Sequence, residues 1–155
     1  MEVKKTICVD FDGVIHSYLS GWQGADVIPD PIVPHAISQL YYYLANYRVA
    51  VYSARSGQPG GIEAMKAFIE KADQEWRKRI RTFELPDFEL IGRLEFPSSK
   101  PPAILYIDDR AYRFEGTFPT TEWIEAHSSS WVSGLNPDTP LIDQIRQSEN
   151  WTIKQ

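Results

Sequence analysis

The feature that most constrains the fold is an almost unbroken apolar run near the start of the chain, which ends at two carboxylates. The run reads Thr6-Ile7-Cys8-Val9, and Asp10 and Asp12 follow it. A strand with one wetted face alternates polar and apolar residues, whereas a continuous apolar run suits a strand buried on both faces of a parallel sheet. The run therefore predicts a buried parallel strand whose carboxyl end carries two aspartates.

Further along the chain, segments of helical and strand periodicity alternate. Apolar residues recur at helical spacing in three segments, the first with Pro34 expected in its first turn. The expected helices span residues 33–44, 62–81 and 120–127, and the expected strands span residues 6–9, 48–52, 88–91 and 103–107. This alternation predicts an α/β fold with a mostly parallel central sheet, formed as a single domain over residues 1–155.

Composition limits the classes of function. The chain has 155 residues, of which 43% are hydrophobic and 24% charged, as in ordinary globular domains. No apolar run approaches the roughly 20 residues of a membrane helix, and no signal-peptide pattern is present, so we expect a cytoplasmic protein with no membrane partner. The single cysteine, Cys8, excludes an internal disulfide or a multi-cysteine zinc site. The net charge of −5 argues against a surface that binds nucleic acid throughout.

The aspartates that end the first strand predict a metal site. Parallel sheets place their ligand sites beyond the carboxyl ends of the strands. On an extended backbone Asp10 and Asp12 point to the same side. Two adjacent carboxylates repel each other, and a cation relieves that repulsion. Mg²⁺ favours such a place, since it takes one or two carboxylates together with waters and phosphate oxygens.

Two other strand ends carry groups that suit phosphate chemistry. Ser53-Ala54-Arg55 follows the second strand, where a hydroxyl and free backbone amides can hold a phosphoryl group. Asp108 and Asp109 end the last strand and form a second acidic pair. Acidic pairs at two strand ends and a hydroxyl at a third together predict metal-dependent chemistry on a phosphate.

In their order along the chain, these segments resemble the haloacid dehalogenase-like (HAD) phosphatase superfamily. The resemblance covers roughly residues 5–112 and rests on four segments: Ile7-Cys8-Val9-Asp10-Phe11-Asp12-Gly13-Val14, Val51-Tyr52-Ser53-Ala54-Arg55, Lys100, and Tyr106-Ile107-Asp108-Asp109-Arg110. It implies a Rossmann-like three-layer fold. It also implies a magnesium-dependent phosphoric monoester hydrolase that works through an aspartyl-phosphate intermediate.

The resemblance also implies roles for individual residues. Asp10 would be the nucleophile, Asp12 the general acid and then the general base, and Ser53 the group that holds the phosphoryl oxygens. Magnesium would be bound by Asp10, by the backbone carbonyl of Asp12 and by Asp108, with Asp109 close by. Superfamily members that lack the aspartate at the Asp12 position tend to do other chemistry, so a phosphatase is favoured over a dehalogenase.

A lysine is expected to neutralise the surroundings of the nucleophile, and Lys100 is the candidate. It is the lysine that lies between the second and last motifs and outside the expected helix. Residues just before a parallel strand start at the wrong edge of the sheet, so Lys100 can serve only if the preceding loop carries it to the cleft. Arg93 is the reserve candidate.

The lengths between the motifs leave no space for an inserted cap domain, so we expect an open site. The turn-rich segment 13–34 would form a flap over the cleft. In that flap, Trp22 either stacks on a base or another ring or folds back on the domain, while His16 is expected to be structural or to lie on the rim. The expected substrate-binding residues are Ser53, Ala54, Arg55 and Trp22.

The substrate is expected to be a phosphorylated small molecule, a nucleotide or a nucleic-acid end. The resemblance favours the last two, because nucleotidases and polynucleotide phosphatases of the superfamily share the capless or lightly capped layout and an Asp-Asp-Arg ending. The competing hypothesis is a phosphate-binding or regulatory domain without significant turnover. The sequence leaves the oligomeric state open.

Overall fold

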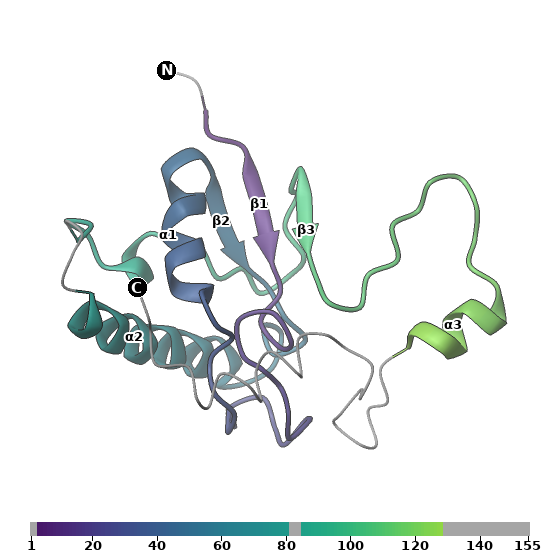
Figure 1. Cartoon of the computed structure of the whole chain (residues 1–155), viewed down its shortest axis with the longest axis horizontal. Helices are drawn as coiled ribbons and strands as arrows, with labels where there is room; N and C mark the ends of the chain where they lie inside the picture. Colours follow the sequence, from purple (N-terminus) through teal and green to yellow (C-terminus); the bar gives the residue numbers. More distant parts are fainter. Residues whose placement is uncertain (1–2, 81–84, 129–155) are drawn as a thin grey trace.

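The computed structural model describes residues 3–80 and 85–128 and shows an α/β fold around a small parallel sheet (Figure 1). Three strands pair in the order β2-β1-β3, with β1 (Thr6–Val9) between β2 (Arg48–Val51) and β3 (Leu105–Ile107). Both pairings of β1 are parallel. The carboxyl ends of all three strands therefore meet at the same edge of the sheet.

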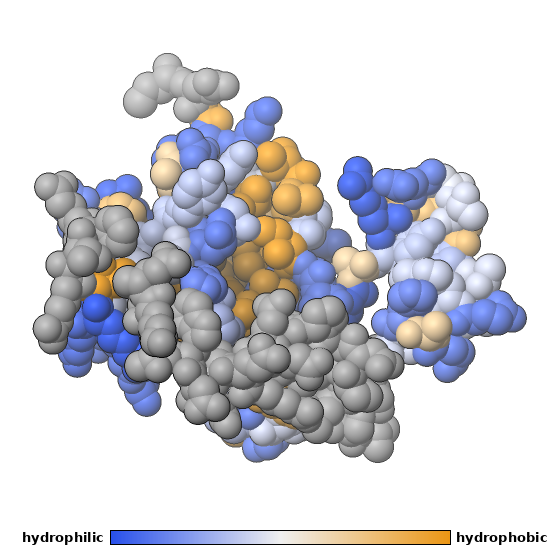
Figure 2. All heavy atoms as spheres, viewed as in Figure 1, coloured by the Kyte–Doolittle hydropathy of each residue, from blue (hydrophilic) through white to orange (hydrophobic). Residues whose placement is uncertain are grey.

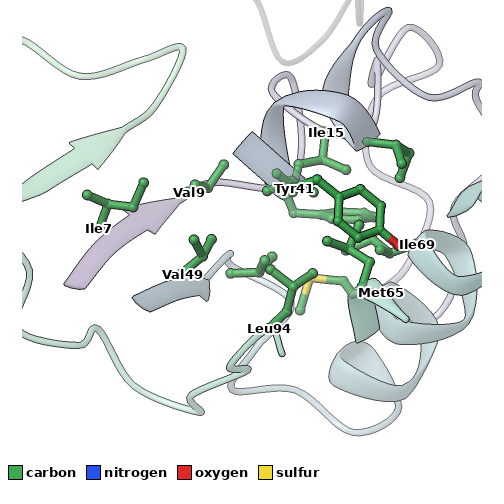
Figure 3. Close-up of a cluster of buried hydrophobic side chains, with 13 residues drawn as sticks. Ile7, Val9, Ile15, Tyr41, Val49, Met65, Ile69 and Leu94 are labelled. Atoms are coloured by element: carbon green, nitrogen blue, oxygen red, sulfur yellow. The ribbon is translucent and has the colours of Figure 1, made fainter. Parts of the chain in front are cut away.

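Two helices pack on one face of this sheet. They are α1 (Ala36–Asn46) and α2 (Gly61–Arg79), and both contribute side chains to the same buried cluster as β1 and β2. Figure 3 shows Ile7 and Val9 of β1 and Val49 of β2 in one buried cluster with Met65 and Ile69 of α2. Burial of these apolar side chains is the main force that holds the sheet and the two helices together.

The last helix is placed differently. Helix α3 (Thr121–His127) follows a long segment after β3 and lies apart from the sheet (Figure 1). None of its residues is buried. Thr120 caps it, since the side-chain oxygen accepts a hydrogen bond from the backbone N–H of Trp123. The helix expected over residues 120–127 is confirmed, and besides its cap it is held by the Trp123 ring, which packs edge-on against Tyr112 with the ring centroids 5.0 Å apart.

The strand expected over residues 88–91 is wrong. This segment instead contains the 3-10 turn η1 (Leu90–Gly92), in which Leu90 is fully buried and its backbone N–H donates to Oδ2 of Asp73 at 3.1 Å. A short apolar run does not distinguish a strand from a buried turn, so periodicity alone misplaced it.

The strand-like pairing lies a few residues later, at Glu95. Its backbone N–H donates to the Val49 carbonyl at 2.9 Å, and its carbonyl accepts from Val51 at 2.8 Å. The Glu95 side chain forms an exposed ion pair with Arg48. A charged residue at the edge of a sheet lacks the apolar signature of a strand, which is why the pattern missed this pairing.

Element boundaries shift slightly from expectation. Helix α1 starts at Ala36, so Pro34 lies before the helix and not in its first turn. The residue between them, His35, has a left-handed backbone with φ 65° and no side-chain cap. In the described part of the chain, no helix is both long enough and apolar enough to cross a membrane.

Candidate active site

Three carboxylates converge at the carboxyl edge of the sheet. Asp10 follows β1, and Asp108 and Asp109 follow the neighbouring strand β3. One carboxylate oxygen from each lies within 4.8 Å of the others. The backbone N–H of Asp10 donates to the Ile107 carbonyl at 2.9 Å, so the pairing of β1 with β3 continues as far as the acidic residues. The sheet itself therefore fixes how these carboxylates face one another.

The acidic cluster is electrostatically costly without a cation. Burial, and next the negative charge of Asp108, raise the pKa of Asp10 to about 8. Burial also raises the pKa of Asp109, although the Arg110 charge opposes this. At neutral pH Asp10 therefore retains a proton unless a cation takes its place. Three carboxylates supply the hard oxygen ligands that Mg²⁺ prefers, so these residues fit the ion that the sequence predicts.

Gly13 gives Asp109 the space to enter this cluster. A Cβ atom on Gly13 would lie 2.2 Å from Oδ2 of Asp109 and 2.6 Å from its Cγ. The backbone at Gly13 has a φ of 84°, a conformation that residues with a side chain rarely adopt. The sequence indicated Gly13 only as the residue of a sharp turn, whereas its closeness to Asp109 is visible only in the folded chain.

The side chain of Asp12 has different partners from Asp10. Nε of Arg55 donates to both of its oxygens, at 2.9 and 3.1 Å, and Nδ1 of His16 lies 2.9 Å from Oδ1. Asp12 is therefore held by an ion pair and a histidine, outside the group of three carboxylates. The metal contact predicted for Asp12 is through its backbone carbonyl, and it stays a prediction.

His16, which the sequence predicted to be structural or to lie on the rim, is a buried residue that positions Asp12, a contact that the sequence did not predict. It is fully buried, and its Nε2 accepts a hydrogen bond from the backbone N–H of Asp30 at 3.2 Å. Because Nε2 is the acceptor, Nδ1 carries the hydrogen and donates it to Asp12. The only local signal was the spacing of four residues from Asp12, and in a loop without periodicity that spacing does not predict a contact.

Arg55 lies at the centre of a buried clamp. It is completely inaccessible to solvent, and its Nη1 donates to the carbonyls of Gly24, Ala25 and Val27 at 2.8 to 3.0 Å. The Trp22 ring covers the guanidinium with its centroid 4.9 Å from Cζ. These contacts attach segment 13–34 to the turn after β2. The substrate contacts expected of Arg55 and Trp22 stay predictions, and the observed contacts of both residues are within the protein.

Ser53 closes the turn after β2, beside the end of β1. It is buried, its Oγ accepts from the backbone N–H of Arg55 at 3.3 Å, and its own N–H donates to Oγ of Ser56 at 3.0 Å. Ala54, between them, is exposed. Ser53 thus lies at the same edge of the sheet as Asp10, which is the location that the predicted phosphoryl contact requires.

Lys100 reaches the pocket that contains the acidic residues. The Ser98 carbonyl passes 3.7 Å from where a Cβ of Gly57 would lie, beyond the carboxyl end of β2. The chain then returns to the opposite edge, where the Ile104 N–H donates to the Thr6 carbonyl at 2.9 Å. As a result Lys100 lines the same pocket as Asp10 and Asp108. The reserve candidate, Arg93, lies over the Phe88 ring and lines a different pocket.

The pocket with Asp10 and Asp108 has a volume of about 790 Å³. Within the described ranges, the residues that line it come from β1, from β3, from Tyr52 and from segments 100–104 and 111–113. Segment 13–34, expected as a flap over the cleft, contributes no residue to this lining; it lies beside Asp12 and Arg55, and its Gly13 lies against Asp109 of the acidic cluster.

The chain matches none of the protein-family models, curated proteins or solved structures with which it was compared. The fold and the site place the protein in the class of α/β domains that have a parallel sheet and an acidic cluster at its carboxyl edge.

Proposed function

We propose that this protein is a magnesium-dependent phosphohydrolase of the HAD-like type, with a Rossmann-like, capless domain and a cytoplasmic location. It would hydrolyse a phosphate monoester through an aspartyl-phosphate on Asp10. One observation carries the proposal: Asp10, Asp108 and Asp109 meet at the carboxyl edge of the sheet, and Lys100 lines the pocket that holds the first two.

Asp10, Asp108 and the backbone carbonyl of Asp12 would hold the magnesium ion, with Asp109 beside them. When bound, the ion would offset negative charge on the carboxylates and on the phosphoryl group. The ammonium of Lys100 would offset a further part of that charge. Such compensation matters because hydrolysis of phosphate monoesters is among the slowest uncatalysed reactions and demands on the order of 20 kcal/mol or more of catalysis.

In the first step a carboxylate oxygen of Asp10 attacks phosphorus, the bond to the alcohol oxygen breaks, and Asp12 gives a proton to that oxygen. In the second step water attacks phosphorus, Asp12 takes its proton, and Asp10 leaves. Arg55 and His16 hold the Asp12 carboxylate in one orientation through three donated hydrogen bonds. Because both Asp12 oxygens accept these hydrogen bonds, the bonds favour the ionised carboxylate, which is the form that takes the proton from water in the second step.

A direct assay tests the proposal. We expect the full chain to release phosphate from an aryl phosphate in the presence of Mg²⁺ and to stop when the ion is chelated. If neither an aryl phosphate nor a panel of phosphorylated metabolites and nucleotides is hydrolysed, while inorganic phosphate still binds, the chain is a phosphate-binding or regulatory domain.

Magnesium binding is expected to release about one proton at pH 7. The pKa of Asp10 is raised to about 8 without metal, so its carboxyl group is protonated at pH 7 and must ionise to bind the ion. The apparent affinity for Mg²⁺ should therefore fall as the pH drops below about 8, approaching tenfold per pH unit. Calorimetry in two buffers with different ionisation enthalpies measures the released protons.

Two variants make this measurement specific. Asp108→Asn removes one charged ligand and should raise the magnesium concentration needed for binding. Asp87→Asn removes the same charge at an exposed position outside the cluster and serves as the control. Equal magnesium affinities in the two variants would contradict the assignment of Asp108 as a ligand.

A further inference from the structure

The pocket beside Asp10 is larger than a phosphoryl group requires. Its volume of about 790 Å³ lies in the range of pockets that enclose an organic molecule. Besides Asp10 and Asp108, it is lined by aromatic, aliphatic and cationic side chains. The aromatic ones are Tyr52, Tyr106 and Tyr112, and the cationic ones are Lys100 and Arg113. A phosphate ester bound at Asp10 would therefore have the rest of its molecule in contact with these groups.

The pocket extends along the sheet face that is opposite to α1 and α2. Because side chains alternate along a strand, Ile7 and Val9 point into the core and Cys8 points to the other face. Tyr106 is the partner of Cys8 in the register, and both residues line the pocket. Apolar surface is visible in the region of β3 in Figure 2, where Ile104 and Leu105 are exposed.

Two of the tyrosine rings are fixed in place and yet accessible. The Tyr106 hydroxyl donates to the Pro101 carbonyl at 2.6 Å, and the Tyr112 hydroxyl donates to the Thr117 carbonyl at 2.8 Å. Both residues remain 39% exposed. An aromatic ring whose orientation is already fixed loses little entropy when a planar ligand stacks on it, so such rings favour the binding of a planar group.

Cations accompany these rings in a chain whose net charge is −5. The Lys100 ammonium lies 4.3 Å from the centroid of the Tyr106 ring, and Arg113 lies at the outer part of the same lining, where it pairs with Glu115. Aromatic rings and cations together suit a ligand that is both planar and negatively charged.

We propose that this pocket binds the alcohol part of the substrate, and that this part carries an aromatic ring which stacks on Tyr106 and Tyr112. The inference rests on the proposed function, because it takes Asp10 as the site of attack on the phosphoryl group. A nucleotide unit has the required chemistry, either as a free mononucleotide or at the phosphorylated end of an oligonucleotide. We call the region formed by Tyr106, Tyr112 and Lys100 the aromatic subsite.

The test compares two substrates with the same leaving group. A nucleoside 5′-monophosphate and ribose 5-phosphate share the esterified alcohol and differ by the base, so the ratio of their kcat/KM values measures recognition of the ring. We expect this ratio to exceed ten in the unaltered protein. Tyr106→Leu and Tyr112→Leu should each lower it by about 5- to 100-fold, which corresponds to the loss of one stacked ring.

Tyr42→Leu is the matched control, because Tyr42 is 67% exposed on α1 and does not line the pocket. This variant should leave the ratio as it is. An oligonucleotide with a terminal phosphate forms a separate arm: a kcat/KM above that of the mononucleotide identifies a nucleic-acid end as the source of the ring, and a lower value identifies the free nucleotide.

The outcomes separate the two proposals. If the protein hydrolyses both esters and neither tyrosine variant changes the ratio, the aromatic subsite is refuted and the proposed function stands. If no ester is hydrolysed, the proposed function fails. Calorimetric binding of the nucleoside monophosphate then tests whether the aromatic subsite exists. At least fivefold weaker binding by Tyr112→Leu would support it, and undetectable or unchanged binding would overturn it. If Tyr106→Leu does not fold, Tyr112→Leu alone carries each comparison.

Discussion

Asp10→Asn should lower the kcat for any phosphate ester by at least a thousandfold, because an amide is neither a competent nucleophile nor a charged metal ligand. The substitution keeps the size and shape of the side chain, so the variant should fold. Phosphate release with Mg²⁺ at saturation measures the loss, and circular dichroism checks the fold. Residual activity within tenfold of the parent would remove Asp10 from the role of nucleophile.

The same variant has an expected effect on stability that does not depend on turnover. The pKa of Asp10 is raised to about 8 in the folded state, above the value near 4 of an unfolded chain, so the folded protein binds this proton more tightly. The stability of the metal-free parent should therefore fall as the pH rises from about 4 to about 8. Asp10→Asn lacks this dependence, so its Tm should exceed that of the parent by more at pH 8 than at pH 5. An equal difference at both pH values would contradict the burial of an ionisable Asp10.

Arg55→Leu should cause the largest loss of stability, about 3–5 kcal/mol, because it leaves the partner of a buried ion pair without its counter-charge. The change removes the ion pair with Asp12 and the donors to three carbonyls of segment 13–34. The carbonyls of segment 13–34 would then lose a charged donor, and the Asp12 carboxylate would keep His16 but lose its counter-charge in a poorly hydrated environment. Urea unfolding, followed by circular dichroism, measures the effect as a lower midpoint.

Arg48→Leu provides the control for Arg55→Leu. It also removes an arginine from an ion pair, with Glu95, but that pair lies at the exposed edge of the sheet and contributes little. Its unfolding midpoint should therefore stay close to that of the parent. Similar midpoints for the two variants would show that Arg55 does not hold segment 13–34. A higher KM for Arg55→Leu with an unchanged unfolding midpoint would instead favour the substrate contact that the sequence predicts for Arg55.

The fold class, the central strand and the edge of the sheet that carries the acidic cluster were predictable from the order of residues along the chain. A continuous apolar run predicts a buried parallel strand, and the run at residues 6–9 is the central strand β1. The apolar stripe after Gly61 likewise predicts α2 to within two residues at each end. Carboxyl ends of parallel strands meet at one edge for geometrical reasons. The convergence of Asp10 with Asp108 was therefore predictable, because local periodicity locates the two strands and parallel pairing brings their carboxyl ends together.

The groups that each acidic side chain contacts were not predictable from the sequence and became clear from the folded chain. Asp12 faces Arg55 and His16 and not its neighbour Asp10, and no periodicity of the loop indicates these partners. The position of Lys100 depends on a connection that passes beyond the end of β2 before it returns to start β3. The fixed orientation of Tyr106 depends on the same path, because its hydroxyl donates to the Pro101 carbonyl. Arg55 is far from Asp12 in sequence, and the pairs Asp12–His16 and Tyr106–Pro101, although close in sequence, lie in segments without periodicity; in both cases the chain must pack before the contacts exist.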